Sequence, residues 1–205
     1  MNRVLIVFLI LMCLSSFVCA QYDSAIDEIT QFQKELNESY KDPKTSPLTP
    51  NALKRFKKHE FFPPNLEYRV TARLLVTEAT PFFKMKTTTQ DLHDYRIFGM
   101  VEFSVQGNTF KVPVYQSQRL MDVPEYKDYL FFPFTDLTNG NETYSGGRYI
   151  ELRIPSEGNE LIIDFNKAYN PYCAYNDRYS CPVVPPENHL AIEVMAGTKY
   201  KQRKK

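Results

Sequence analysis

The sequence predicts a mainly β fold, a compact antiparallel β-barrel or sandwich with one N-terminal helix. Three observations lead to this prediction. Short segments after residue 67 alternate apolar and polar residues with a period of two, turn-forming residues separate these segments, and no helical pattern comes between them. We also expect a long loop rich in Tyr, Asn and Pro, braced by a disulfide.

Residues 1–20 have the pattern of a secretory signal peptide. An apolar run extends from Val4 to Met12, and Val18-Cys19-Ala20 places small residues where signal peptidase cleaves. The run is too short for a stable membrane anchor. We therefore expect export to the periplasm or the exterior, with Gln21 as the new N-terminus. Lipidation of Cys19 is the alternative, although Val18 fits that motif poorly.

Residues 21–66 are predicted to hold a helix and a connector. Five apolar residues recur near the helical period and form one stripe: Ile26, Ile29, Phe32, Leu36 and Tyr40. Pro43 disfavours helix in the residue before it, so the helix should end near Asp42. Thr49 as a cap and Pro50 in the first turn predict one further short helical turn.

Residues 67–198 are predicted to form the β domain. Tyr68–Val76 and Tyr95–Val105 alternate as half-buried strands. Gly107-Asn108 predicts a tight hairpin turn into a strand over 110–114. Because proline cannot donate to a ladder, Pro113 predicts an edge at that point.

The second half of this domain predicts further strands. Leu130–Phe134 ends at Asp136, and a last strand is expected over 190–194. Segments 149–154 and 161–165 flank a turn and are predicted to form a second hairpin. Adjacent hairpin strands would bring Arg148 close to Asp164.

The charge of the chain is balanced, with 25 basic and 24 acidic residues. Such a chain has no overall field that attracts nucleic acid, and it has no second apolar stretch long enough to cross a membrane. Residues 199–205 form a basic tail: Lys199, Lys201, Arg203, Lys204 and Lys205. The tail is either a solvated end or a patch for anionic lipid or polysaccharide.

Two cysteines, Cys173 and Cys181, follow the signal peptide. An oxidising compartment favours a disulfide between them, and free thiols are the alternative. A zinc site would need two more ligands, and His189 is the one nearby candidate. We therefore predict no metal and no cofactor.

Known catalytic patterns are absent from the sequence. There is no Gly-x-Ser-x-Gly elbow, phosphate-binding glycine loop or His-Glu-x-x-His motif. The three histidines, His59, His93 and His189, are widely separated. These absences argue against a hydrolytic triad.

Two segments are candidates for a site. In Glu142–Tyr149, Gly146-Gly147 permits positive φ and close approach by a ligand or by another part of the chain. Asp164–Asn188 is a long loop whose Tyr and Asn side chains suit a neutral polar ligand. The same side chains would also suit a loop that satisfies its own buried backbone groups.

These motifs resemble a bacterial family labelled domain of unknown function 1684. The resemblance lies in Leu130–Asp136, in Glu142–Tyr149, in the long loop and in Ala196–Lys199, where Thr198 departs from the usual Glu. Upstream, segments 55–62 and 68–70 also fit. The resemblance implies a bacterial source and a single domain for these motifs. It implies no activity.

Three hypotheses for function follow. We favour a module that binds a small polar or sugar-like ligand through six residues: Arg148, Asp164, Asn166, Tyr169, Asn170 and Tyr175. A hydrolase-type enzyme would use Asp164 or Glu142 as the base, Arg148 for charge and Tyr144 or Tyr169 as the proton donor. A structural envelope protein would act through the basic tail and the helix stripe. The ligand and the oligomeric state stay open.

Overall fold

The computed structural model describes residues 23–78 and 80–201. The predicted signal peptide, the lipidation site at Cys19 and the last four residues of the basic tail lie outside the described residues. Among the described residues, no helix is long and apolar enough to span a bilayer.

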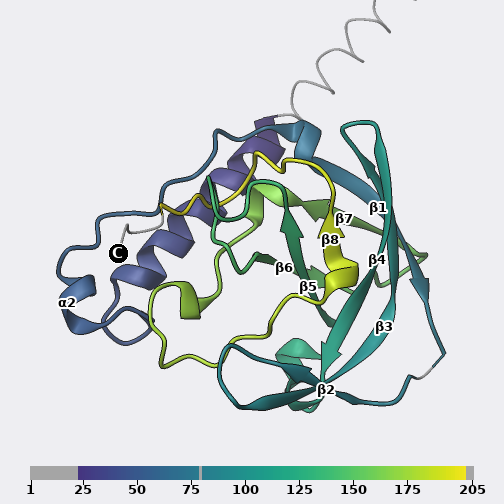
Figure 1. Ribbon diagram of the computed structural model, residues 1–205. Helices are drawn as coiled ribbons and strands as arrows, with labels where there is room; N and C mark the ends of the chain where they lie inside the picture. The colour runs from purple at the N-terminus through teal and green to yellow at the C-terminus, as the bar shows by residue number, and fades with distance from the viewer. Residues whose placement is uncertain (1–22, 79, 202–205) are drawn as a thin grey trace, which may run out of the picture.

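The predicted β fold is confirmed, and it is a nearly closed, barrel-like sheet (Figure 1). The strands are β1 (Arg69–Val76), β2 (Phe83–Lys86), β3 (Leu92–Val105), β4 (Asn108–Ser117), β5 (Tyr129–Asp136), β6 (Arg148–Arg153), β7 (Glu160–Asp164) and β8 (His189–Leu190). The short helices are α2 (Pro50–Leu53), α3 (Gln118–Met121), η1 (Leu66–Tyr68), η2 (Pro124–Tyr126), η3 (Phe165–Lys167), η4 (Tyr172–Ala174) and η5 (Pro186–Asn188).

The main sheet has the order β6-β5-β4-β3-β1-β7, with antiparallel neighbours. β2 adds to β3, and β8 pairs in parallel with β5. The two end strands, β6 and β7, contact each other across the seam of the barrel. The barrel is nearly closed because its two end strands are in contact. It is not fully closed because, among the described residues, no hydrogen-bonded ladder joins them.

The predicted second hairpin is therefore wrong. β6 pairs with β5, with Ile150 opposite Phe132, and β7 pairs with β1, with Ile163 opposite Val70. The turn between them crosses the seam instead of closing a hairpin. Alternation and a turn identify two neighbouring strands, but the curvature of the whole sheet decides whether those strands pair.

The first hairpin is confirmed, with its turn one residue earlier than predicted. Gln106 and Gly107 have φ of 49° and 75°, the left-handed pair that a tight hairpin turn requires. β4 lies between β3 and β5 in the sheet order, but its only pair with β5 is Tyr115 with Phe131. At Pro113 the strand therefore pairs on one side alone, with Met100 of β3, as the proline predicts.

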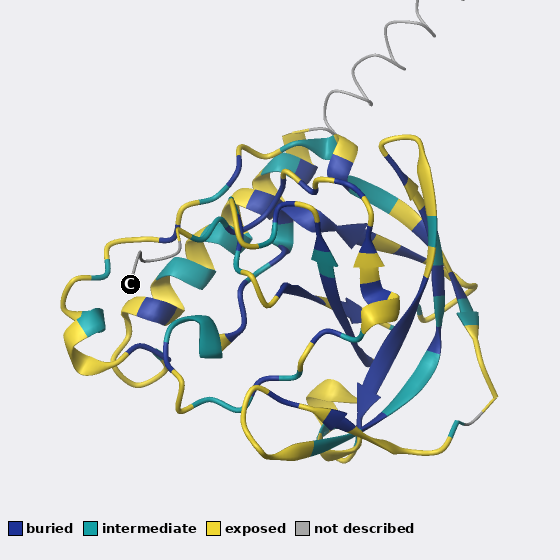
Figure 2. Ribbon diagram, viewed as in Figure 1, coloured by how far each residue is buried: buried dark blue, intermediate teal, exposed yellow. Residues whose placement is uncertain are grey.

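Aromatic side chains fill the barrel. Phe132, Phe134 and Phe165 are fully buried, and the Phe134 and Phe165 rings meet edge to face with centroids 5.3 Å apart. Every residue of β5 except Thr135 is buried, so this strand lies at the centre of the core. Figure 2 shows buried residues mainly along the strands and exposed residues mainly in the connecting loops.

The N-terminal helix covers residues 23–41 and ends where Pro43 predicts. It lies beside one end of the barrel, next to the C-terminal segment (Figure 1). Its stripe packs within the chain, since Ile29 and Tyr40 are buried. The predicted cap of α2 is also present, with the Thr49 hydroxyl accepting from the Ala52 amide at 3.3 Å.

The predicted last strand is much shorter than expected. β8 contains two residues, and the chain beyond it is irregular. This segment still bonds to three separate parts of the fold: Ile192 O accepts from Leu137 N, Lys199 N donates to Glu60 O, and Tyr200 N donates to Glu142 O. The first residues of the basic tail are thus docked on the domain.

Candidate functional site

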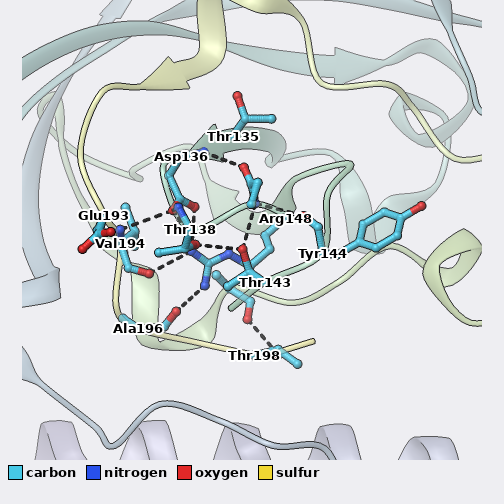
Figure 3. Close-up of polar contacts among 12 residues, drawn as sticks. Thr135, Asp136, Thr138, Thr143, Tyr144, Arg148, Glu193, Val194, Ala196 and Thr198 are labelled. Atoms are coloured by element: carbon cyan, nitrogen blue, oxygen red, sulfur yellow. Dashed lines mark hydrogen bonds and ion pairs between the residues drawn. The ribbon is translucent and has the colours of Figure 1, made fainter. Parts of the chain in front are cut away.

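Arg148, a candidate for ligand contact, is fully buried in a structural ion pair. Its guanidinium donates to Asp136 Oδ2 at 2.7 Å and to the carbonyls of Val194 and Ala196. Figure 3 shows Arg148 among these partners. The guanidinium also lies over the Phe134 ring, 5.1 Å from its centroid. Burial lowers the pKa of Arg148, and the Asp136 carboxylate opposes that shift. Arg148 therefore joins β5 and β6 to the C-terminal segment and has no surface for a ligand.

The partner carboxylate is held equally firmly. Asp136 Oδ1 accepts from the Thr138 amide at 2.8 Å and from the Thr138 hydroxyl. The Thr138 hydroxyl in turn meets the Thr143 hydroxyl at 2.8 Å. A buried carboxylate with this many partners stabilises a loop, here residues 137–143, rather than performing acid–base chemistry.

Gly147 explains the glycine pair before Arg148. Its φ is +88°, and a Cβ there would lie 2.6 Å from the Phe134 carbonyl oxygen and 2.7 Å from Val184 Cγ2. The close approach is therefore made by the chain itself and not by a ligand. Of the two interpretations of this segment, the structural one holds.

Asp164 does not meet Arg148, contrary to the expectation from a hairpin. Its Oδ2 accepts from Arg69 at 2.9 Å, and its Oδ1 accepts from the Asn166 amide and side chain. Asn166 also exchanges two hydrogen bonds with the backbone of Asn65, 101 residues earlier. Asp164 and Asn166 thus brace η3 against the start of β1.

The remaining loop candidates divide into two groups. Tyr169 donates to Glu151 at 3.2 Å, and its backbone pairs with Tyr149 on the outer edge of β6. Asn170 is buried and donates to the Tyr175 hydroxyl at 2.9 Å, while its Oδ1 has no partner among the described residues. Tyr169 therefore supports β6, whereas Asn170 orients Tyr175.

Cys173 and Cys181 lie together in the structure as free thiols, so the disulfide stays a prediction. The Cys173 amide donates to Cys181 Sγ at 3.2 Å. The hydrogen bond from the Cys181 thiol lowers the pKa of Cys173 to about 7, and the same hydrogen bond raises the pKa of Cys181. His189 instead bonds to Thr135, away from the thiols.

A cleft of about 880 Å³ lies at the helix end of the barrel, away from most of the predicted site. Its walls come from α2 and the connector after it, from the turn at 144–145, from η4 and from the C-terminal segment. Two predicted candidates, Tyr144 and Tyr175, line it. Glu142 lies beside it, where its carboxylate pairs with Lys199 at 2.7 Å.

Tyrosine rings form one wall of the cleft. Tyr200 stands between Tyr144 and Tyr175, with ring centroids 5.2 Å and 5.7 Å away. Figure 3 shows the Tyr144 side chain directed away from the buried Arg148 network. Burial and the neighbouring Cys173 raise the pKa of Tyr144 to about 12, so its hydroxyl keeps its proton at neutral pH.

His59 supplies the cleft with a neutral imidazole. Asn37 Nδ2 donates to the Gln33 carbonyl, which leaves Asn37 Oδ1 as the acceptor for both the His59 amide at 2.7 Å and His59 Nδ1 at 3.1 Å. Nδ1 must therefore carry the proton, and Nε2 keeps a lone pair. Burial lowers the pKa of His59 to about 4, so the ring is uncharged at neutral pH.

Sequence reasoning missed His59 and the connector around it. A lone histidine between Lys58 and Glu60 carries no recognisable pattern, and its partner Asn37 lies 22 residues earlier on the helix. The available signal was Phe56 and Phe61 on either side, which pack within 4.9 Å and 6.0 Å of the imidazole. Only the fold places that cluster beside the long loop.

Residues 54–199 match the family described as "Protein of unknown function (DUF1684)". The match covers the connector, the whole barrel and the docked C-terminal segment. This chain belongs to that family. The resemblance seen in the motifs is thereby confirmed, and the residues of the cleft from Arg55 to Lys199 lie inside the matched region.

A solved structure has the same architecture. An uncharacterised protein of Haloarcula marismortui, determined in solution by NMR, is 30% identical, with a TM-score of 0.69. The similarity covers 88% of this chain and 97% of that one. No curated protein matches the chain. These similarities establish the family and the fold.

Proposed function

We propose that the mature chain is an exported module that binds a small polar, sugar-like ligand in the cleft at the helix end of the barrel. The single observation behind this proposal is the combination of aromatic faces with a neutral hydrogen-bond acceptor. Tyr175 and Tyr200 offer ring faces for the C–H groups of a sugar. His59 Nε2 offers a lone pair to a hydroxyl group.

The volume of the cleft supports this size class. About 880 Å³ falls within the range of small-molecule sites, roughly 300–1,000 Å³. The walls are also held in place by contacts that do not involve a ligand. Asn170 and Tyr200 position Tyr175, and Asn37 positions His59. A preorganised site loses less entropy on binding.

A thermal-shift screen of the mature chain tests the proposal. Neutral and charged monosaccharides and disaccharides are added to the wild type, to His59→Phe and to His93→Phe. A ligand at about one hundred times its Kd stabilises the native state by about 2.7 kcal/mol, which raises Tm by several degrees. His59→Phe keeps an aromatic ring but has no lone pair, so it should lose most of this shift.

His93→Phe is the matched control, because His93 lies on β3 and outside the cleft. It should respond to ligand as the wild type does. If no saccharide raises Tm, or if His59→Phe responds fully, the cleft is not the site proposed. Export is tested separately: N-terminal sequencing of the secreted chain should begin at Gln21.

The hydrolase alternative is weakened, because its predicted catalytic residues do not lie together. Asp164 pairs with Arg69, Arg148 is buried with Asp136, and Glu142 pairs with Lys199. These side chains serve different partners and do not converge on one reacting atom. The envelope alternative is weakened too, because Ile29 and Tyr40 of the helix stripe are buried within the domain and its other three residues are partly buried.

A further inference from the structure

The cleft concentrates positive charge in a chain that is almost neutral. Five cationic residues line it, against one carboxylate, Glu60, whereas the whole chain has a formal net charge of +1. The five are Arg55, Lys57, Lys58, Lys199 and Lys201. A hollow lined by one sign of charge focuses its field and raises the local concentration of oppositely charged ligand.

Two of the five cations already have carboxylate partners. Lys199 Nζ lies 2.7 Å from Glu142 Oε2, and Lys201 Nζ lies 3.1 Å from Glu60 Oε1. Lys199 also lies over the Phe62 ring, 4.8 Å from its centroid. These contacts hold the C-terminal segment against the connector and explain both lysines without a ligand.

The other three cations have no such explanation. Among the described residues, no carboxylate lies within ion-pair distance of Arg55, Lys57 or Lys58, and all three side chains are exposed. Exposed lysines are common and are often only solvated. These three differ because they follow one another along the rim of the same aromatic cleft.

Their backbone is also held in place. Arg55 N donates to Ala52 O and Phe56 N donates to Leu53 O, both at 3.1 Å. The Phe56 ring packs 5.8 Å from Tyr40 and 4.9 Å from His59, between centroids. The cations therefore project from a fixed segment that also contributes Phe56 and His59 to the wall of the cleft.

We propose that the ligand of this cleft is an anionic saccharide, a sugar that carries a carboxylate or a phosphate. A hydroxyl group of the sugar would donate to the neutral His59 Nε2, and the C–H groups of the sugar ring would pack beside Tyr175 and Tyr200. Its anionic group would face Arg55, Lys57 and Lys58 on the rim. This inference rests on the proposed function and adds the charge of the ligand to it.

Calorimetry on the mature chain tests the inference with four probes: glucose, glucuronate, glucose 6-phosphate and inorganic phosphate. We expect at least one of the two charged sugars to bind about tenfold or more tightly than glucose. The stronger of the two identifies the anion as carboxylate or phosphate. Raising the salt concentration should weaken this binding, because the rim cations are exposed and screened.

The triple variant R55Q/K57Q/K58Q should remove the preference for the charged sugar and leave Tm unchanged. Each exposed charge contact can raise the binding affinity by up to about fivefold. Three such contacts are therefore enough to explain a preference of about tenfold for the charged sugar. The matched control is K86Q/K111Q/K127Q, which removes the same charge from exposed lysines outside the cleft. It should bind all four probes as the wild type does.

Three results would overturn the inference in distinguishable ways. If glucose binds as tightly as the charged sugars, the ligand need not be anionic and the proposed function stands. If inorganic phosphate binds as tightly as glucose 6-phosphate, the rim is an anion site and the saccharide proposal is wrong. If none of the four probes binds, both proposals fail.

Discussion

Acidification should destabilise this protein through His59 before the bulk of its carboxylates are protonated. Burial lowers the pKa of His59 from 6.5 to about 4 in the folded state. Between pH 6.5 and about pH 4, His59 is protonated in the unfolded chain but stays unprotonated in the folded chain. Stability is therefore complete above pH 6.5 and is lost as the pH falls toward 4.

The magnitude follows from the two pKa values. The folded state binds the proton about three hundred times more weakly, which corresponds to about 3 kcal/mol when the effect is complete. By pH 4.5 about 2.5 kcal/mol of this should be lost. His59 is 6% exposed and ringed by Tyr40, Phe56 and Phe61, so solvent screens the effect little.

Urea denaturation of the wild type and of His59→Phe at pH 7 and pH 4.5 measures the effect. The variant keeps ring packing against Tyr40 but has no group to titrate. Protonation of carboxylates lowers the stability of both proteins alike. The difference between the two proteins in the free energy of unfolding lost from pH 7 to pH 4.5 therefore reports on His59 alone. An NMR titration of the His59 ring nitrogens should show protonated Nδ1 and unprotonated Nε2 at pH 7.

The reasoning is refuted if the two proteins lose the same free energy of unfolding between pH 7 and pH 4.5, within about 0.5 kcal/mol. A proton on Nε2 at pH 7 would also contradict the orientation inferred from Asn37. His93→Phe serves as the control for the loss of a histidine outside the cleft.

Three further predictions concern residues that hold the barrel together. Arg148→Met and Asp136→Asn should each cost about 3–5 kcal/mol in urea denaturation, because each leaves a buried polar group unpaired. The double variant R148M/D136N should be less destabilised than the sum of the two single variants, and strict additivity would argue against the pair. Gly147→Ala should lower Tm sharply, because the new Cβ would lie 2.6 Å from the Phe134 carbonyl oxygen at a residue whose φ is +88°. Gly158→Ala is the control for positive φ alone, since a Cβ at Gly158 would have no atom within 4 Å. Alkylation of the reduced protein should modify Cys173 before Cys181 with a midpoint near pH 7, and equal reactivity of the two thiols would contradict the asymmetry. Oxidation of a separate, unalkylated sample should form the predicted bridge and raise the free energy of unfolding by about 2–3 kcal/mol.

Local patterns were sufficient for the elements of this fold. Period-two alternation identified β1 and β3, because a half-buried strand must alternate whatever its neighbours are. Capping and proline signals identified the end of the N-terminal helix and the start of α2 for the same reason: they act within a few residues of chain.

Pairing was beyond these patterns. The segments of β6 and β7 look like a hairpin, yet each pairs elsewhere, with β5 and β1. A strand presents the same alternation to any partner, so the seam of the barrel leaves no trace in the local sequence. The expected meeting of Arg148 and Asp164 failed with the hairpin on which it depended.

Residue patterns were enough to establish the fold class, the family motifs and the presence of two neighbouring cysteines. Which polar residues are structural and which face a cleft depends on how distant parts of the chain come together. The sequence predicts ligand contacts at Arg148, Asp164 and Asn166. In the structure these side chains are buried, and their hydrogen bonds are made within the domain. His59 is an isolated histidine in the sequence, yet the helix residue Asn37 sets the position of its proton and the long loop brings Tyr175 beside it. The C-terminal segment places Tyr200 next to Tyr175. Function depends on such long-range meetings, and the free energy that enforces them comes from the whole core.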